Sequence, residues 1–160
     1  MKFCYYFALL LYYSIANKIP NKFGGLILRK KLVKHIIISC GKNVHIAENV
    51  YFGMGKNLIL HDNARIGKGS KILGNGIVEI GSYNVMGPEV MMITGDHKMS
   101  FDSDKTTNTS ISEGIVIGDE CYIGARVTIL KGVKIGERSV VGACSLVNNC
   151  LLYTSPSPRD

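Results

Sequence analysis

Residues 117–147 of this 160-residue chain read IGDECYIGARVTILKGVKIGERSVVGACSLV. An aliphatic residue recurs at every sixth position of this stretch, and glycine follows it at positions 118, 124, 136 and 142; the recurring residues are Ile117, Ile123, Ile129, Ile135, Val141 and Val147. An amphipathic helix would space its apolar residues by three and four, and a half-buried strand would alternate over one short run. A period of six that persists over five units instead indicates a stacked repeat.

The period predicts a three-walled coil. If each unit is a short strand followed by a bend, three units of six residues close one triangular turn, and the aliphatic residue of each unit points inward. Glycine is expected at the bend, because a Cβ there would be costly. A narrow interior also needs small or β-branched residues, which follow four positions after each aliphatic: Cys121, Val127, Val133, Ser139 and Ser145. We therefore predict an all-β fold.

The same period extends towards the N-terminus, with interruptions. The predicted inward residues are Ile46, Phe52, Leu60, Ile66, Ile72, Ile80, Met86 and Met92. The steps from Phe52 to Leu60 and from Ile72 to Ile80 are eight residues, which predicts a two-residue bulge at a corner in each case. Residues 94–114 carry no hexad and are rich in Ser, Thr, Asp and Lys. We expect an excursion loop there, and long loops in a tight repeat are often functional.

These hexads resemble those of the hexapeptide-repeat acyltransferases, whose fold is a left-handed parallel β-helix. The left hand is implied by the resemblance alone, since the usual crossover preference is right-handed. The resemblance covers roughly residues 12–147. The segments CGKNVHIAENVYFG and GSYNVMGPEVMMITGDH resemble the branch of sugar O-acetyltransferases found in capsule, exopolysaccharide and colanic-acid synthesis. That resemblance implies a sugar hydroxyl of a surface-polysaccharide precursor as the acceptor. It implies acetyl-CoA as acyl donor, no metal, and a homotrimer with active sites between subunits.

The resemblance further implies a catalytic residue. His97, in the context MMITGDHK, matches the family's general base, which helps a sugar hydroxyl attack the thioester. An imidazole with an ordinary pKa near 6.5 is mostly neutral at pH 7 and can accept the hydroxyl proton. Asp96, Asp102 and Asp104 are candidates to orient the ring, and the sequence does not choose among them. No role is assigned to His35, His45 or His61.

The remaining site residues come from the same resemblance. Ala125 and Ala143, with the preceding Gly124 and Gly142, match positions whose backbone meets the pantetheine arm of coenzyme A; the alternative is plain turn geometry. Tyr122 stands where family members often carry Trp and is the candidate acceptor-site residue. Gly67 stands where the galactoside and maltose enzymes carry Asn, and their substrate-binding Asp has no evident match.

Residues 1–35 form a segment of different character, which we predict to be helical. They hold seven Lys or Arg and no Asp or Glu, whereas residues 36–160 hold twelve of each sign. The apolar run Phe3–Ala16 is 14 residues long, short of the roughly 20 that span a bilayer. The segment either packs on the coil or makes a peripheral membrane contact; a cleaved signal is a further alternative. Nucleic-acid binding is not expected, because the charge forms no stripe over the repeats.

The chain is expected to divide into residues 1–35, a repeat domain at 36–149 and a tail at 150–160. The tail, CLLYTSPSPRD, resembles a translated sequencing adapter, so we expect it to be non-native and the domain to be cut short at its C-terminus. Five cysteines without a CxxC pair indicate reduced thiols and a cytoplasmic protein, either free in the cytoplasm or at the inner face of the membrane. The functional alternatives are a serine-type acetyltransferase, a non-catalytic scaffold and, on the same coil, a metal-dependent lyase, for which the additional His ligands are missing.

Overall fold

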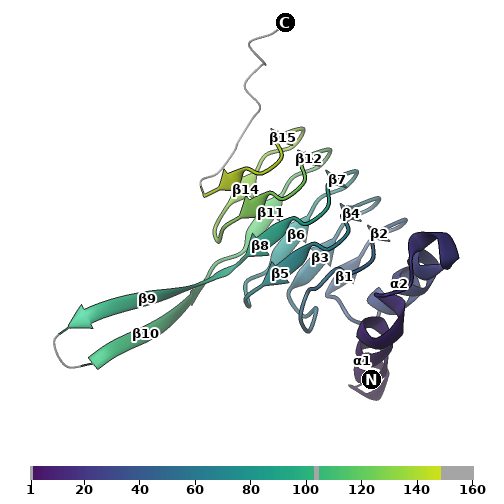
Figure 1. Cartoon of the computed structure of the whole chain (residues 1–160), viewed down its shortest axis with the longest axis horizontal. Coiled ribbons are helices and arrows are strands. Elements are labelled where there is room, and N and C mark those ends of the chain that lie inside the picture. Colours follow the sequence, from purple (N-terminus) through teal and green to yellow (C-terminus); the bar gives the residue numbers. More distant parts are fainter. Residues whose placement is uncertain (1, 103–104, 149–160) are drawn as a thin grey trace, which may run out of the picture.

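The computed structural model describes residues 2–102 and 105–148, with residues 2–3, 97–102 and 105–110 described by their backbone alone. Two helical stretches come first, and short strands wound into a column follow (Figure 1). The helical part consists of α1 (Lys2–Leu11), a π-helix (Tyr12–Ala16), a 3-10 helix (Asn21–Phe23) and α2 (Gly25–Val33). None of the described helices is long and apolar enough to cross a membrane.

The column has three parallel walls, and each turn of the coil adds one strand to a wall. Wall 1 contains β1 (Ser39–Cys40), β3 (Leu58–Leu60), β6 (Val78–Ile80), β11 (Ile115–Ile117) and β14 (Lys134–Ile135). Wall 2 contains β2 (His45–Ile46), β4 (Arg65–Ile66), β7 (Val85–Met86), β12 (Tyr122–Ile123) and β15 (Val140–Val141). Wall 3 contains β5 (Lys71–Leu73), β8 (Met91–Ile93), β13 (Thr128–Ile129) and β16 (Leu146–Val147), and Tyr51 bridges to Lys71 below them.

The register stacks each hexad aliphatic on its equivalent in the next turn. Ile80 pairs with Ile117, which pairs with Ile135, and the other two walls repeat this arrangement. Every predicted inward aliphatic is buried, the most exposed being Met86 at 7%. The triangular coil and its inward residues are therefore confirmed. The two bulges also occur at the expected steps, and they stack, because the Asn57 side-chain amide donates to the carbonyl oxygens of Gly74 and Gly76.

The hexad glycines have a different reason from the one expected. The left-handed backbone conformation falls two positions later and is usually taken by other residues, for example Glu89, Arg126 and Arg138. The glycine itself lies directly against the next turn: a Cβ on Gly124 would be 2.5 Å from the backbone nitrogen of Ala143. Glycine is thus required by the close approach of stacked backbones and not by the bend.

The excursion after wall 3 is a regular β-hairpin, not the irregular loop that its composition suggested. β9 (Gly95–Asp102) and β10 (Lys105–Ser112) pair antiparallel and project away from the column (Figure 1). At about 3.4 Å per residue, eight-residue strands extend roughly 27 Å. The Ser/Thr-rich composition had hidden this ribbon, because neither strand alternates clearly between apolar and polar residues.

The helical stretch covers the first turn of the column. Tyr12 is fully buried against Phe52, with ring centroids 4.8 Å apart, and the Tyr13 hydroxyl donates to the carbonyl oxygen of Gly53 at 2.9 Å. Burial raises the pKa of Tyr13 to about 12. Arg29 of α2 is also fully buried and donates to the carbonyl oxygens of Ala16, Ile19 and Ile46 and to the Asn21 side chain. One side chain of α2 therefore bonds to the π-helix, the 3-10 helix and β2.

Candidate functional site

The hairpin leaves the column at the corner between walls 3 and 1, where its base is firmly bonded. The Glu113 backbone nitrogen donates to the Thr94 carbonyl oxygen at 2.9 Å, and the Thr94 hydroxyl donates to the Leu73 carbonyl oxygen at 3.0 Å. Beside this base lies a hollow of about 330 Å³, lined by Leu73, Gly74, Asn75, Ile93, Gly95, Asp96 and Ser112. Its polar lining comes from the second bulge and from the start and end of the hairpin.

His97 is the residue of β9 that follows this hollow, and its backbone pairs with Ser110. The direction of its ring lies outside the described part of the chain. Of the candidate orienting carboxylates, Asp96 lies 3.4 Å from the Lys131 ammonium, so a lysine from the neighbouring turn faces the hairpin base. The Asp102 side chain and Asp104 lie outside the description. Sequence analysis did not anticipate Lys131, whose place became clear only when the turns were stacked.

The predicted cofactor residues come together at the corner between walls 2 and 3. Gly124 and Ala125 occupy this corner in one turn, and Gly142 and Ala143 lie directly over them in the next. The Cys144 backbone nitrogen donates to the Ala125 carbonyl oxygen at 2.8 Å, which fixes the stack. Gly124 is buried and Ala143 is exposed. These four residues therefore form an edge of backbone and small side chains on which an extended amide-bearing chain could lie, beside the exposed Arg126, which pairs with Glu89 at 2.8 Å.

Tyr122 lies on the outer face of wall 2, away from the hairpin. Its side chain is 51% exposed and is flanked in the neighbouring turns by Val85 and Val140, which are 43% and 64% exposed. We call these three residues the outer column. Within one chain, wall 3 separates the stacked corner from the hairpin base, and wall 2 is the wall opposite that base. The structure therefore does not bring Tyr122 and His97 together in a single chain.

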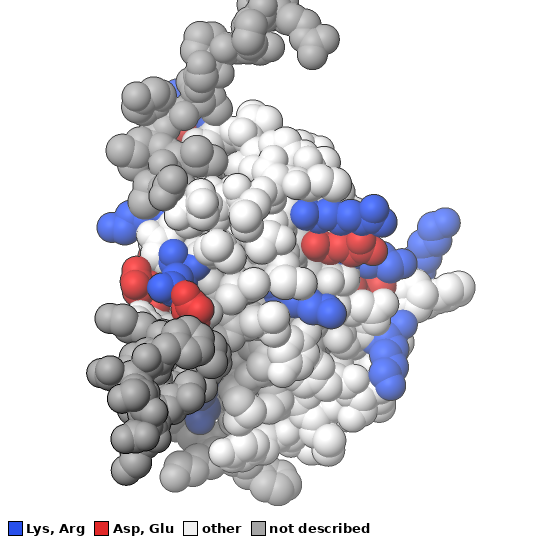
Figure 2. Space-filling view, turned by 60° about the vertical axis from the view of Figure 1, so that its left-hand side comes forward, with Lys and Arg blue, Asp and Glu red and all other residues white. Residues whose placement is uncertain are grey.

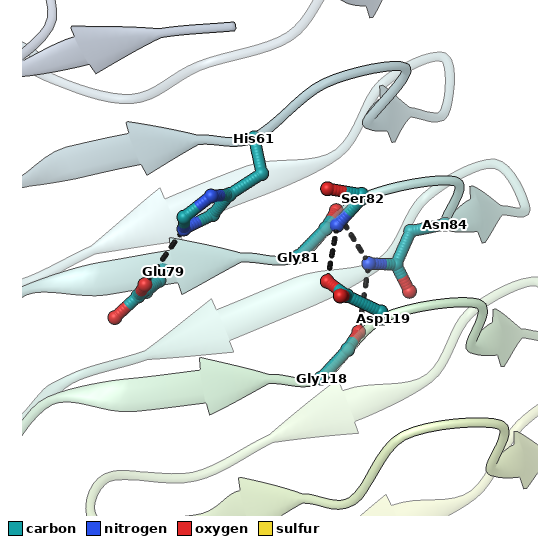
Figure 3. A network of polar contacts seen from close by, with 7 residues as sticks. All are labelled: His61, Glu79, Gly81, Ser82, Asn84, Gly118 and Asp119. Atoms are coloured by element: carbon teal, nitrogen blue, oxygen red, sulfur yellow. Dashed lines mark hydrogen bonds and ion pairs between the residues drawn. The ribbon is translucent and has the colours of Figure 1, made fainter.

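A polar network at the corner between walls 1 and 2 was not anticipated. Asn84 is fully buried, and its side-chain nitrogen donates to the carbonyl oxygens of Gly81 and Gly118 (Figure 3). Its side-chain oxygen accepts a hydrogen bond from the Cys121 backbone nitrogen. Asn84 lies four positions after the hexad aliphatic Ile80, at the small inner position. There its side chain forms hydrogen bonds to the next turn of the coil. The His61 ring lies 2.7 Å from the Glu79 carboxylate on the outside of wall 1 (Figure 3).

The difference at Gly67 has a steric cause. A Cβ at this position would overlap the carbonyl oxygen of Gly87 in the next turn. No side chain fits there, so the Asn of the galactoside and maltose pattern has no counterpart at this place. Charges over the column are mixed: on the face in Figure 2, Lys and Arg lie close to Asp and Glu, and broad uncharged surface separates these groups.

Comparisons with known proteins agree with this geometry. Residues 114–149 match the family described as Bacterial transferase hexapeptide (six repeats). Galactoside O-acetyltransferase of Escherichia coli K12 is 31% identical over 119 residues, which cover 74% of this chain and 58% of that protein. The chain spans 41% to 58% of the length of the first curated relatives it matches.

Two solved structures share the fold over nearly the whole chain. Galactoside acetyltransferase in complex with coenzyme A has a TM-score of 0.77 at 27% identity, covering 92% of this chain and 72% of that one. A hexapeptide-repeat acetyltransferase of Vibrio cholerae O1 biovar eltor, complexed with acetyl coenzyme A, has a TM-score of 0.75 at 25% identity, covering 94% and 79%. The chain is thus a hexapeptide-repeat protein with the left-handed parallel β-helix fold.

Proposed function

We propose that the chain is an acetyl-CoA-dependent O-acetyltransferase that moves an acetyl group to a sugar hydroxyl. The observation that carries this proposal is the hairpin inserted into the hexapeptide coil, which begins at a polar hollow and carries His97 in its first strand. The similar proteins are named galactoside acetyltransferases, and two similar structures hold coenzyme A or acetyl coenzyme A.

In the proposed reaction, His97 is the general base. Its neutral imidazole accepts the proton of the sugar hydroxyl as the hydroxyl oxygen bonds to the thioester carbonyl carbon. The C–S bond then breaks, and the His97 imidazolium donates the proton to the departing sulfur, so that acetylated sugar and free coenzyme A thiol are formed. General-base catalysis of this kind contributes about 10²–10⁴-fold. Holding donor and acceptor together contributes further.

For the donor, we propose that Gly124, Ala125, Gly142 and Ala143 form the edge that holds the pantetheine arm. Support comes from the small size of these residues and their stacking on successive turns. Tyr122 is proposed to contact the acceptor. Because wall 3 separates this edge from the hairpin within one chain, a complete site needs His97 from one subunit and the edge from another.

A homotrimer supplies that arrangement. The outer column exposes three apolar side chains in adjacent turns, and such a stripe on a stacked wall is a natural contact surface. If wall 2 packs against a neighbouring subunit, the stacked corner lies at the rim of the contact, where the neighbour's hairpin can reach it. The donor would then bind in three grooves between subunits.

We also propose that the acceptor is a precursor of a surface polysaccharide, such as capsule or exopolysaccharide, and that the enzyme works in the cytoplasm at the inner face of the membrane. Support comes from the similarity to sugar acetyltransferases and from the basic segment 1–35, which suits a peripheral membrane contact.

The test follows release of free thiol from acetyl-CoA in the presence of a sugar panel, with serine as an additional acceptor. We expect thiol release with a sugar, and a loss of about 10²–10⁴-fold in kcat for His97→Ala with little change in KM. His61→Ala is the control, because His61 pairs with Glu79 away from the hairpin. Full activity in His97→Ala would remove the base assignment. Thiol release with serine alone would indicate a serine-type enzyme. Absence of thiol release with every acceptor would indicate a non-catalytic scaffold.

A further inference from the structure

α2 and the first turn of the column lie at the opposite end of the molecule from the last turn (Figure 1). A second hollow lies between them. Its volume is about 690 Å³, the largest among the hollows described here. We call it the basic groove; it is lined by Leu26, Ile27, Lys30, Lys31, Lys34, His35, Asn43, Val44 and His45. None of the proposed catalytic or cofactor residues contributes to it.

The lining combines an apolar part with one sign of charge. Leu26 and Val44 are partly or fully buried, and Ile27 is 63% exposed. Three lysines line the groove, and no Asp or Glu does. The Lys30 ammonium is 3.3 Å from the Asn43 side-chain oxygen, which draws it across the groove between α2 and the first turn. The groove therefore suits an anion that is attached to an apolar group.

His45 adds a hydrogen-bonding group and little charge. Burial, and then the positive charges of Arg65 and Arg29, lower the pKa of His45, so its ring is neutral at pH 7. Glu48 acts in the opposite direction, but it pairs with Lys68 at 3.1 Å. The positive charge of the basic groove comes from its lysines.

Exposed apolar side chains also occur on the helical segment that carries the groove. Phe23, two residues before α2, is 79% exposed, and α1, which contacts α2, exposes Phe7 and Leu10 at 54% and 63%. Exposed aromatic and aliphatic residues beside lysines are typical of segments that lie in the interface of a membrane. Anionic lipid headgroups attract such lysines. Apolar side chains such as Ile27 and Phe23 can insert at the boundary between headgroups and acyl chains.

We propose that the basic groove binds the phosphate headgroup of an anionic phospholipid and thereby docks residues 1–35 on an anionic membrane surface. The lysines contact the phosphate, and Ile27 and Phe23 enter the headgroup region. This inference deepens the proposed membrane contact, and it is independent of acetyl transfer, because the groove shares no residue with the proposed active site.

The test is sedimentation of the full chain with phosphatidylcholine vesicles that contain phosphatidylglycerol. A lysine near an anionic surface contributes about fivefold in affinity, so Lys30→Gln/Lys34→Gln should bind about 30-fold more weakly. Lys71→Gln/Lys134→Gln removes the same charge from two exposed positions on the column and should lose much less. Equal losses in both double variants would mean that total charge acts and the groove does not. Equal binding to pure phosphatidylcholine, or no binding to either vesicle, would also overturn the proposal.

Two further measurements make the outcome specific. Ile27→Gln should weaken vesicle binding severalfold, whereas Ile77→Gln, which alters an isoleucine 51% exposed on the column, should not. Soluble glycerol phosphate should not displace the protein at concentrations that match the lipid; displacement would identify a free-phosphate site instead. Thermal unfolding shows whether each variant is still folded. This control is needed because Lys30 lies in the last turn of α2, where its positive charge stabilises the helix. Acetyl transfer to a soluble sugar should persist in all of them, which separates this test from that of the proposed function.

Discussion

At the scale of single residues, the function of a hexad glycine depends on what the next turn places above it. Gly124 and Gly142 occupy the same position in consecutive repeats and follow the aliphatics Ile123 and Val141. A Cβ on Gly124 would meet the Ala143 backbone nitrogen at 2.5 Å, whereas among the described residues a Cβ on Gly142 would meet only the Ser145 hydroxyl, at 3.7 Å. Identical sequence signals therefore carry different energetic weight.

This difference gives a prediction. Gly124→Ala should lower the free energy of unfolding by about 1–3 kcal/mol, because backbone atoms of the next turn must move. Gly142→Ala should be neutral or stabilise by up to about 1 kcal/mol, because neither residue has positive φ and alanine restricts the unfolded chain. Urea denaturation followed by circular dichroism compares the two. Equal destabilisation would mean that the bend, and not the stacking, requires glycine.

At the scale of elements, the guanidinium of Arg29 joins α2 and the π-helix that follows α1 to the column. Arg29→Leu would keep the apolar stem but leave the carbonyl oxygens of Ala16, Ile19 and Ile46 without their donor. A buried acceptor without a donor costs about 1–3 kcal/mol, so we expect a loss of about 3 kcal/mol or more in the free energy of unfolding. Hydrogen exchange should show lost protection over residues 4–33 before the strands of walls 1–3. Lys31→Leu, an exposed change on the same helix, should leave protection unchanged.

The hairpin is the second element with an independent test. Its base is already closed by the bond from the Glu113 nitrogen to the Thr94 oxygen, so the coil does not depend on β9 and β10. Replacing residues 96–111 with two glycines should shift Tm by a few degrees and abolish acetyl transfer. A deletion variant that unfolds would mean that the ribbon supports the column, and one that keeps its activity would exclude His97 from the reaction.

At the scale of the whole molecule, the outer column decides whether the chain acts alone. Val85→Lys places a charge at one end of the outer column, next to Tyr122, and a desolvated charge without a partner opposes association. Light scattering after gel filtration should show a trimer for the unaltered chain and a shift to monomer for Val85→Lys. Ile77→Lys, at an exposed isoleucine of a bulge, is the matched control. An unaltered chain that is monomeric at all concentrations would contradict both the trimer and the shared site.

The hexad period by itself determined the class of fold, the inward residues and the position of the bulges. Each six-residue unit has the same order of apolar, small and glycine residues, so every unit is an independent indication of the same packing. It also fixed where the coil is interrupted, because the period fails over residues 94–114. The family resemblance, and not the period, gave the left hand and the role of His97.

Only the tertiary structure decided how these parts meet. It replaced the expected loop with a ribbon, assigned the glycines to stacking, and brought Lys131 to the hairpin base and the basic groove to the far end of the column. It also separated Tyr122 from the hairpin by a whole wall. Such relations join residues from different turns, and they depend on the register between turns, which no single hexad specifies. That is the physical reason why the sequence predicted the walls of this protein but not the surfaces that lie between them.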